Sequence, residues 1–246
     1  IGNRDDEKGE YMLRDTKAKT YFFSLNDGTK SDFTGKIVNQ SLDGLTLLIN
    51  NKEVQTKLIG NFNAHNVLGI FATAKLLGIP EDKIINSISS ITAPTGRLEF
   101  IKSKDGKYGV VDYAHTPDAL ENVLVTLSQI KPKSTKIMTV VGCGGDRDKT
   151  KRPIMGSIAC RLSDFVFFTS DNPRSEDPED ILKDIVKDLP EIVENYKSIV
   201  NREVAISEAC KQAVSGDIIL VAGKGHETYQ IFAVETIHFS DMEKLE

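Results

Sequence analysis

Short apolar segments alternate with helix-like patterns in the second half of the chain, and this alternation is the feature that most constrains the fold. From about Leu98 onward, the segments at 108–112, 136–141, 164–169 and 218–222 are apolar almost throughout, which is typical of strands buried on both faces. Because helical patterns separate these strands, we predict an α/β fold with a doubly wound, mostly parallel sheet and helices on both faces. One helix is expected to begin at Pro117, with Thr116 as its N-cap. Three further helices are expected at about 154–162, 178–189 and 204–214.

The first 60 residues have a different pattern, that of short strands joined by turns. Strands are expected at 34–38, 45–49 and 54–58, with Asp43-Gly44 and Asn50-Asn51 as the turn residues of a β-meander.

The period then changes to that of a helix. Apolar residues recur at helical spacing from Ala64 to Leu77, Gly78 and Pro80 end this helix, and a second helix is expected at about 81–91. Ala-Pro-Thr-Gly at 93–96 has the composition of an interdomain linker. We therefore predict two domains, residues 1–95 and 96–246.

Composition and charge exclude several classes of protein. The 246 residues carry a net charge of −5, which argues against binding to nucleic acid or to anionic lipid. Apolar runs such as 218–222 are far shorter than the roughly 20 residues of a membrane helix. Three cysteines without a Cys-x-x-Cys pair indicate neither a zinc site nor a disulfide framework, and the polar N-terminus is unlike a signal peptide. We expect a cytoplasmic protein, and a processed or truncated one because the chain lacks an initiator Met.

Polar residues follow the ends of all four predicted parallel strands. In doubly wound sheets, ligands bind beyond the carboxyl ends of the strands, so these loops should converge on one site. The loops are Asp-Tyr-Ala-His at 112–115, Gly-Cys-Gly-Gly-Asp-Arg-Asp at 142–148, Asp-Asn-Pro-Arg at 171–174 and Gly-Lys-Gly-His-Glu at 223–227.

Two of these loops have more than one interpretation. The glycines at 142–145 suit either a phosphate-binding turn or a plain tight turn, and Arg147 replaces the third glycine of the dinucleotide fingerprint. No P-loop pattern occurs, so this chain has no complete nucleotide-phosphate cradle. The 171–174 loop is either an Asx-turn with a solvated Arg174, or a clamp in which Arg174 holds a carboxylate and Asp171 or a nearby acid meets an ammonium. Convergence with Arg147 and Glu227 favours the clamp.

Other polar residues are ambiguous when taken alone. Lys224, His226 and Glu227 suit either an exposed loop or, for Lys224, an electrostatic role near an anion. Asn63 suits a helix N-cap, and Arg97 suits a solvated hinge charge. No serine-hydrolase elbow and no His-Glu-x-x-His pair occurs, and His238 and the cysteines receive no role.

Six motifs, in their order and spacing, resemble the C-terminal half of the Mur ligases, specifically the MurE type. The likeness extends from Leu58 to Asp241, and residues 1–57 fit loosely as trailing strands of the central domain. Two alternatives stay open: another Mur-type amide ligase, such as one making cyanophycin or folylpolyglutamate, and a non-catalytic amino-acid-binding module. The motifs are Asn-Ala-His-Asn at 63–66, Gly-Arg-Leu-Glu at 96–99, Asp-Tyr-Ala-His-Thr-Pro-Asp at 112–118, and the loops at 142–148, 171–174 and 223–227.

The resemblance implies an ATP-dependent amide-bond ligase of peptidoglycan precursor synthesis. ATP would activate UDP-N-acetylmuramoyl-L-alanyl-D-glutamate as an acyl phosphate, and the amine of meso-diaminopimelate would attack it. Residues 1–95 would be the remainder of a central ATP-binding domain, and 96–246 the Rossmann-like, amino-acid-binding domain. The cofactors would be ATP and Mg²⁺, with the P-loop, the carbamylated lysine and most metal ligands upstream. The chain alone is therefore expected to be inactive.

The resemblance also implies roles for individual residues, with no metal ligand among them. Asn63, Asn66, Arg97 and Asp112 would bind the nucleotide, and His115 would act close to the phosphates as a catalytic residue. In this family, Asp-Asn-Pro-Arg marks members that add meso-diaminopimelate, and Arg174 would bind the second carboxylate of that substrate. Lysine lacks this carboxylate, so a bound lysine would leave the guanidinium unpaired at a cost of about 1–3 kcal/mol. The meso-diaminopimelate pocket would comprise Arg147, Asp171, Asn172, Pro173, Arg174, Gly223 and Glu227.

Overall fold

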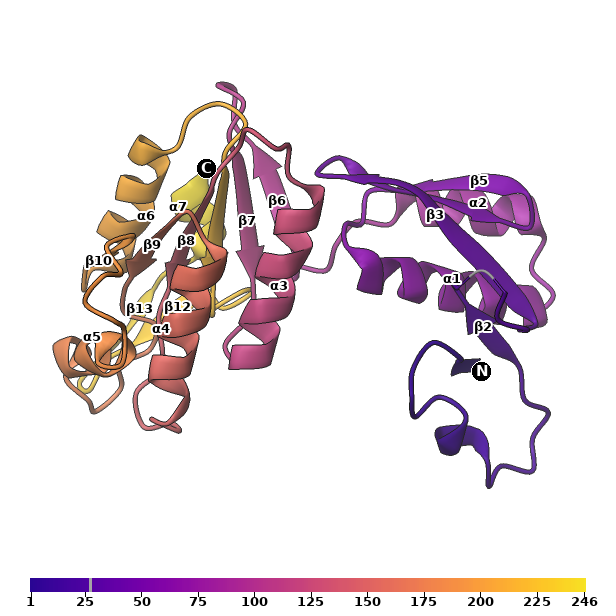
Figure 1. The fold of residues 1–246 in the computed structure, drawn as a ribbon, viewed down its shortest axis with the longest axis horizontal. Coiled ribbons are helices and arrows are strands. Elements are labelled where there is room, and N and C mark those ends of the chain that lie inside the picture. The colour runs from indigo at the N-terminus through magenta and orange to yellow at the C-terminus, as the bar shows by residue number, and fades with distance from the viewer. Residues whose placement is uncertain (27) are drawn as a thin grey trace. The chain divides into compact units, whose positions relative to one another are not determined.

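The computed structural model describes residues 1–26 and 28–246, which form two compact units, Ile1–Thr92 and Ala93–Glu246 (Figure 1). Each unit has its own sheet and its own buried core, and each is described by itself below. The functional assignment of the two predicted domains stays a prediction. In the part of the chain that is described, no helix combines the length and the apolar character needed to span a bilayer.

Within residues 1–26 and 28–92, five strands form one sheet in the order β1-β2-β3-β4-β5. The predicted meander is confirmed, because β3, β4 and β5 pair antiparallel, and Asn50 and Asn51 both have the positive φ of a tight hairpin turn. β1 and β2 join by parallel pairing and were not predicted, since two or three residues carry no detectable period. The bounds are β1 Gly2–Asn3, β2 Phe22–Ser24, β3 Phe33–Ser41, β4 Gly44–Ile49 and β5 Lys52–Thr56, with a 3₁₀ turn, η1, at Tyr11–Leu13.

Two helices, α1 (Asn61–Leu76) and α2 (Glu81–Ser90), complete the first unit. Helix α1 begins three residues before the first apolar position of the predicted pattern, with Gly60 as its N-cap residue. The interpretation of Asn63 as an N-cap is therefore wrong: Asn63 lies in the first turn, and its side-chain amide donates to the carbonyl of Ile59 at 2.8 Å. The backbone geometry of Gly60, with φ of 89°, allows this earlier start.

The second unit contains the predicted doubly wound, mostly parallel sheet. Within residues 93–246, its strand order is β10-β9-β8-β11-β7-β6, and only β6 runs antiparallel to its neighbour. The two edge strands β6 and β10 were not predicted, because each is short and only partly buried. The bounds are β6 Glu99–Lys102, β7 Tyr108–Asp112, β8 Ile137–Val141, β9 Phe165–Phe168, β10 Tyr196–Ser198 and β11 Ile218–Ala222.

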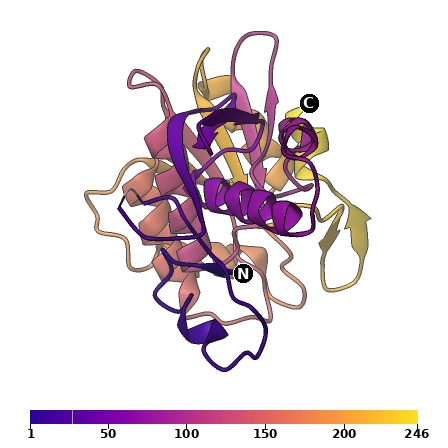
Figure 2. The same cartoon turned by 90° about the vertical axis from the view of Figure 1, so that its right-hand side faces the viewer.

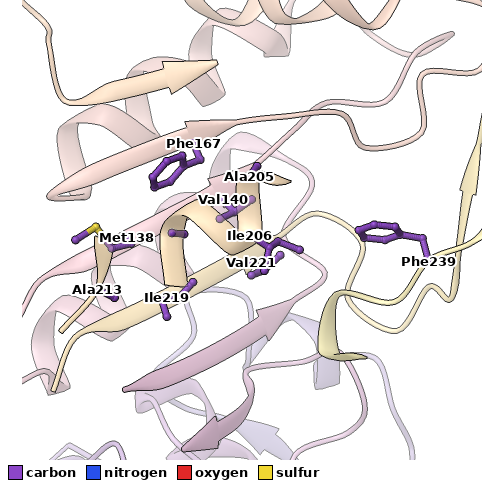
Figure 3. Close-up of a cluster of buried hydrophobic side chains, with 10 residues drawn as sticks. Met138, Val140, Phe167, Ala205, Ile206, Ala213, Ile219, Val221 and Phe239 are labelled. Atoms are coloured by element: carbon purple, nitrogen blue, oxygen red, sulfur yellow. The ribbon is translucent and has the colours of Figure 1, made fainter. Parts of the chain in front are cut away.

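Helices cover both faces of this sheet, as predicted. On one face α6 packs on alternate residues of the central strands, including Met138, Val140 and Phe167 (Figure 3). Residues between these point to the opposite face, where Thr139 contacts Ser163 at the end of α4. The helices are α3 Pro117–Ile130, α4 Lys151–Leu162, α5 Pro178–Val186, α6 Arg202–Gln212 and α7 Asp241–Leu245.

Local signals explain how some of these elements begin. Thr116 caps α3 as predicted, its hydroxyl accepting from the amide of Ala119, and Pro117 is the first helical residue. Helix α4 begins at Lys151, three residues before the predicted start, because Pro153 is tolerated in the first turn. An unpredicted hairpin, β12 (Tyr229–Ile231) with β13 (Thr236–His238), is visible in yellow at the right of Figure 2.

A fully buried ion pair joins α6, α7 and the end of β11. Both side chains, Arg202 and Asp241, have 0% exposure, and Nε and Nη2 of the arginine donate to the two carboxylate oxygens at 2.7 and 2.8 Å. Arg202 also donates to the carbonyl of Ala222, the last residue of β11, at 3.0 Å. Since a buried charge requires a partner, the pair fixes the end of this strand against both helices.

We predict that Arg202→Met lowers the free energy of unfolding by about 3–5 kcal/mol, because it leaves Asp241 buried without a counter-ion. The measurement is urea unfolding followed by circular dichroism. Arg161→Met is the matched control, since Arg161 and Glu121 form an exposed pair at 2.8 Å whose loss costs about 1 kcal/mol or less. Equally small losses in the two variants would contradict the structural role of the buried pair.

Candidate functional site

The carboxyl ends of β7, β8, β9 and β11 meet around a hollow of about 380 Å³. Each of the four polar loops identified in the sequence contributes to its wall, so the prediction that these loops meet at one place is confirmed. This follows from topology, since these strands are parallel and their ends lie at one edge. The lining residues are Tyr113, His115, Thr116, Gly142, Cys143, Gly144, Arg147, Lys151, Asp171, Asn172, Arg174, Gly223, Glu227 and Tyr229.

The glycine loop after β8 is fastened to the Asp-Asn-Pro-Arg loop after β9. The amide of Gly145 donates to the carbonyl of Asn172 at 2.9 Å, and Nη1 of Arg174 donates to the carbonyl of Gly145 at 2.8 Å. A Cβ atom on Gly145 would lie 1.8 Å from the carbonyl oxygen of Pro173, so only glycine allows this approach. The glycine therefore has a packing reason that requires no bound phosphate.

A second set of contacts, around Asp146, also joins the loop after β8 to the loop after β9. Asp146 accepts hydrogen bonds from the amide and the hydroxyl of Ser175, while its own amide donates to Glu176. Glu176 also accepts from Arg152, which is 1% exposed, and from Lys149; these bonds hold the pKa of Glu176 far below its usual range. Sequence reasoning missed Arg152 and Glu176, because neither belongs to a recognisable motif.

The side chain of Asn172 is held by three hydrogen bonds. Its Oδ1 accepts from the amide of Ile231 at 2.9 Å and from Nζ of Lys224 at 3.2 Å, and its Nδ2 donates to Oε2 of Glu227 at 2.9 Å. Two donors on one side and a carboxylate on the other allow only this orientation of the amide. At 2% exposure, Asn172 contributes more to the frame of the hollow than to its open surface.

Lys224 is fully buried, and its Nζ lies 3.0 Å from Oε2 of Glu227 and 5.5 Å from the ring centroid of Tyr229. The interpretation of this lysine as part of an exposed loop is therefore wrong. Gly223 and Gly225 have φ of 115° and 52°, and these values turn the loop so that the lysine between them points inward. The flanking glycines therefore allow Lys224 to pack closely.

Two carboxylates form the acidic part of the hollow. Asp171 is 8% exposed, and burial raises the pKa of its carboxyl, while Arg202 and Lys224 act in the opposite direction. Among described residues, no group donates a hydrogen bond to the Asp171 carboxylate or to Oε1 of Glu227. These oxygens are therefore available to a cationic group entering the hollow.

Two guanidinium groups form the basic part. Arg147 is exposed, and its Nη1 donates to the carbonyl of Asp146 at 3.2 Å. Arg174 is half-buried, has φ of 53°, and is anchored by its amide to the carbonyl of Ile231 at 3.0 Å. Its Nε and Nη2 make no hydrogen bond with the described residues, so both are available to bind a carboxylate in the geometry of a fork.

The residues expected to bind a nucleotide are only partly brought together. His115 lines the hollow, with Nδ1 2.7 Å from the carbonyl of Tyr113. Arg97 stacks on the ring of Tyr113 at 4.9 Å, and Asp112 accepts from the amide of Leu98 at 2.7 Å; neither Arg97 nor Asp112 lines the hollow. Burial raises the pKa of Asp112 despite that hydrogen bond.

In the first unit, Asn66 donates to the side-chain oxygen of Asn63 at 3.1 Å. His65, between these two asparagines in the sequence, contacts Asp5 at 3.1 Å through Nε2. Throughout residues 1–26 and 28–246, no cluster of three or more His, Cys, Asp or Glu side chains is arranged to hold a metal ion.

Comparison with known proteins identifies the family. The model of the family described as "Mur ligase, glutamate ligase domain" matches residues 96–225, which is more than half of the chain. The chain therefore belongs to the Mur ligase family, and the predicted family is confirmed.

Similar proteins carry a more specific name. The chain is 49% identical over 230 residues to a UDP-N-acetylmuramoyl-L-alanyl-D-glutamate–2,6-diaminopimelate ligase of Cytophaga hutchinsonii, covering 93% of this chain and 46% of that protein. A protein of the same name from Bacteroides fragilis is 45% identical over 246 residues, covering 100% of this chain and 50% of its own length. The chain thus spans about half the length of these curated relatives.

Solved structures agree with this fold. A structure of a UDP-N-acetylmuramoyl-L-alanyl-D-glutamate–2,6-diaminopimelate ligase superimposes with a TM-score of 0.73 at 33% identity, covering 99% of this chain and 51% of that one. Folylpolyglutamate synthase of Thermotoga maritima superimposes with a TM-score of 0.67 at 19% identity, covering 87% of this chain and 47% of that one. The second likeness is one of fold alone.

We predict that Cys143, in the wall of the hollow, resists alkylation in the native protein. Burial, together with the charge of Asp171, raises the pKa of its thiol to about 12, so only about 1 in 10⁴ molecules carries the reactive thiolate at pH 8. Iodoacetamide labelling with mass spectrometry should modify Cys160, whose pKa is raised to about 11, before Cys143. Labelling of Cys143 as fast in the folded as in the urea-unfolded chain would contradict this.

Proposed function

We propose that this chain is the acceptor-binding part of an ATP-dependent ligase that adds meso-diaminopimelate to UDP-N-acetylmuramoyl-L-alanyl-D-glutamate. The relatives at 49% and 45% identity are named for this reaction, and the chain matches about half of each. We therefore propose the complete activity for a longer polypeptide, which would contain this chain together with a part equivalent to the other half of these relatives. The chain alone is expected to be inactive.

The observation that carries the proposal is the separation of charge within one hollow. Asp171 and Glu227 offer free carboxylate oxygens, while Arg147 and Arg174 offer guanidinium groups, and all four line the same space. An α-amino acid end presents one ammonium and one carboxylate, so it matches both sets at once. Meso-diaminopimelate has two such ends. One would be held here, which leaves the amine of the other free to react.

The chain's residues would act on the acceptor by positioning it. Holding the amine close to an activated carboxyl group makes the attack effectively unimolecular, which is a large part of the catalysis in such reactions. In the proposed reaction the amine nitrogen forms a bond to the activated carbonyl carbon, loses a proton, and phosphate leaves. We propose that His115, which lines the hollow, acts near the phosphates, and that Gly223 shapes the wall of the pocket. Pro173 does not line the hollow, and we propose that it shapes the pocket through the loop that carries Arg174.

ATP and Mg²⁺ are the proposed cofactors, and this chain has candidate residues for binding ATP. Arg97 lies over the ring of Tyr113, and Nδ1 of His115 lies next to the carbonyl of Tyr113, so we propose that both act on the nucleotide. Asp112 holds the turn that carries Arg97, and we propose that it also contributes to nucleotide binding. Asn63 and Asn66 are proposed to contribute from the first unit. The described residues contain no cluster of three or more His, Cys, Asp or Glu side chains, so we propose that most Mg²⁺ ligands belong to the half of the ligase that this chain does not match, and no step is derived through the metal.

The remaining proposals concern the setting of the reaction. A net charge of −5 supports small-molecule substrates over nucleic acid or anionic membranes as partners. We infer a cytoplasmic location, because the proposed substrates are nucleotide-linked precursors and ATP. Membership of the family supports a ligase over a non-catalytic binding module.

The test is the acceptor dependence of the full-length ligase that carries this chain, assayed by amide-product formation with meso-diaminopimelate or lysine. The wild-type protein should use meso-diaminopimelate and reject lysine. Arg174→Ala should raise the KM for meso-diaminopimelate by about 5- to 150-fold, which corresponds to about 1–3 kcal/mol for an unpaired carboxylate, and leave the KM for ATP nearly unchanged.

Arg161→Ala, on an exposed face of α4, is the control and should change neither constant. An equal rise in both constants for Arg174→Ala would reject the clamp. Product formation with lysine, but not with meso-diaminopimelate, would reject the proposed substrate.

A further inference from the structure

We propose that Lys224 is a positioning residue that sets affinity for the acceptor amino acid through Glu227 and Asn172. This inference rests on the proposed function of the hollow and deepens it. Lys224 has 0% exposure and is not among the lining residues, so it does not contact the ligand itself. Its ammonium group lies directly behind two residues that do line the hollow.

The geometry of Glu227 is the first support. Nζ of Lys224 and Nδ2 of Asn172 both donate to the same oxygen, Oε2, at 3.0 and 2.9 Å. Two donors on one oxygen fix the plane of the carboxylate and leave Oε1 without a partner among the described residues. Lys224 therefore determines which oxygen of Glu227 is offered to a ligand, and in which direction.

The charge of the site is the second support. Asp171 and Glu227 together carry two negative charges when ionised, and Lys224 compensates one of them. The neighbouring Arg202 is already neutralised by Asp241. One net negative charge remains, which matches the single ammonium of one α-amino acid end. Without Lys224, two poorly hydrated carboxylates would face each other, and one of them would take up a proton instead of binding an ammonium.

The hydrogen bonding of Asn172 is the third support. Its Oδ1 has two donors, and Lys224 is the one that comes from the same loop as Glu227. Lys224 thus connects the loop after β11 to the loop after β9, at the point where both reach the hollow. Removal of its ammonium should loosen Asn172 and Glu227 together, and with them the pocket for the acceptor.

The first experiment compares Lys224→Met and Lys224→Arg in the full-length ligase. Lys224→Met should raise the KM for meso-diaminopimelate by about tenfold or more with less than about a twofold change in the KM for ATP. Lys224→Arg keeps the charge and should recover part of the affinity. Lys211→Met is the matched control, since Lys211 also pairs with a glutamate three residues away, Glu208, but is 69% exposed.

The second experiment tests whether Lys224 acts through Glu227. In the double variant Lys224→Met/Glu227→Gln, the rise in the KM for meso-diaminopimelate should be smaller than the product of the rises in the two single variants, because Glu227, one of the two groups that Lys224 positions, is already lost. The double variant removes both charges of the Lys224–Glu227 pair, so it should fold if the single Lys224→Met variant does not. Effects that multiply independently would overturn the proposal, as would an unchanged KM in a folded Lys224→Met protein.

A third readout needs no ligand. Nuclear magnetic resonance of the 246-residue chain should show a changed chemical shift for the side-chain amide of Asn172 in Lys224→Met or in the double variant, and not in Lys211→Met. Absence of any product from the wild-type ligase would reject the proposed function while this readout still tests Lys224. An Asn172 amide unaffected by either Lys224 variant would overturn the positioning role.

Discussion

The side chain of Asn172 holds together the loops that form the hollow. The side chain of Asn172 accepts hydrogen bonds from Ile231 and Lys224 and donates one to Glu227. The backbone carbonyl of Asn172 accepts a hydrogen bond from the amide of Gly145. Asn172 therefore connects the segments that follow β8, β9 and β11, and the strand β12. Since loops without such contacts are the most mobile parts of a fold, a buried amide with satisfied bonds is what gives these loops one defined arrangement.

Ion pairs with a buried arginine or lysine hold several segments near the hollow and act mainly on geometry. Replacement of buried pairs by apolar residues is often neutral for stability, so their presence calls for another explanation. Arg202 holds the end of β11, Arg152 holds the glycine loop through Glu176 and the carbonyl of Gly144, and Lys224 holds Glu227. Each of these three cations has a partner within the protein, so the hollow keeps for a ligand one net negative charge on Asp171 and Glu227, and the guanidinium groups of Arg147 and Arg174.

Much of the fold was predictable because burial leaves a period in the sequence. The four central parallel strands, the mostly parallel sheet and the meander of the first unit follow from apolar runs and from turn residues such as Asn50 and Asn51. Elements without a period were missed: β1 and β2, the edge strands β6 and β10, and the β12–β13 hairpin. The hairpin matters for the site, since its residue Ile231 anchors both Asn172 and Arg174.

For the site, the sequence by itself determined the family and the four loops that reach the hollow, because a parallel sheet brings its strand ends to one edge. Only the tertiary structure decided which polar residues face the ligand and which hold the frame. An exposed loop was one of the two interpretations of Lys224 that the sequence left open, yet this lysine is buried, and Asp112 holds a turn outside the hollow. The physical reason is that burial and hydrogen-bond partners depend on residues distant in sequence, such as Asn172 and Lys224, and no local pattern records that pairing.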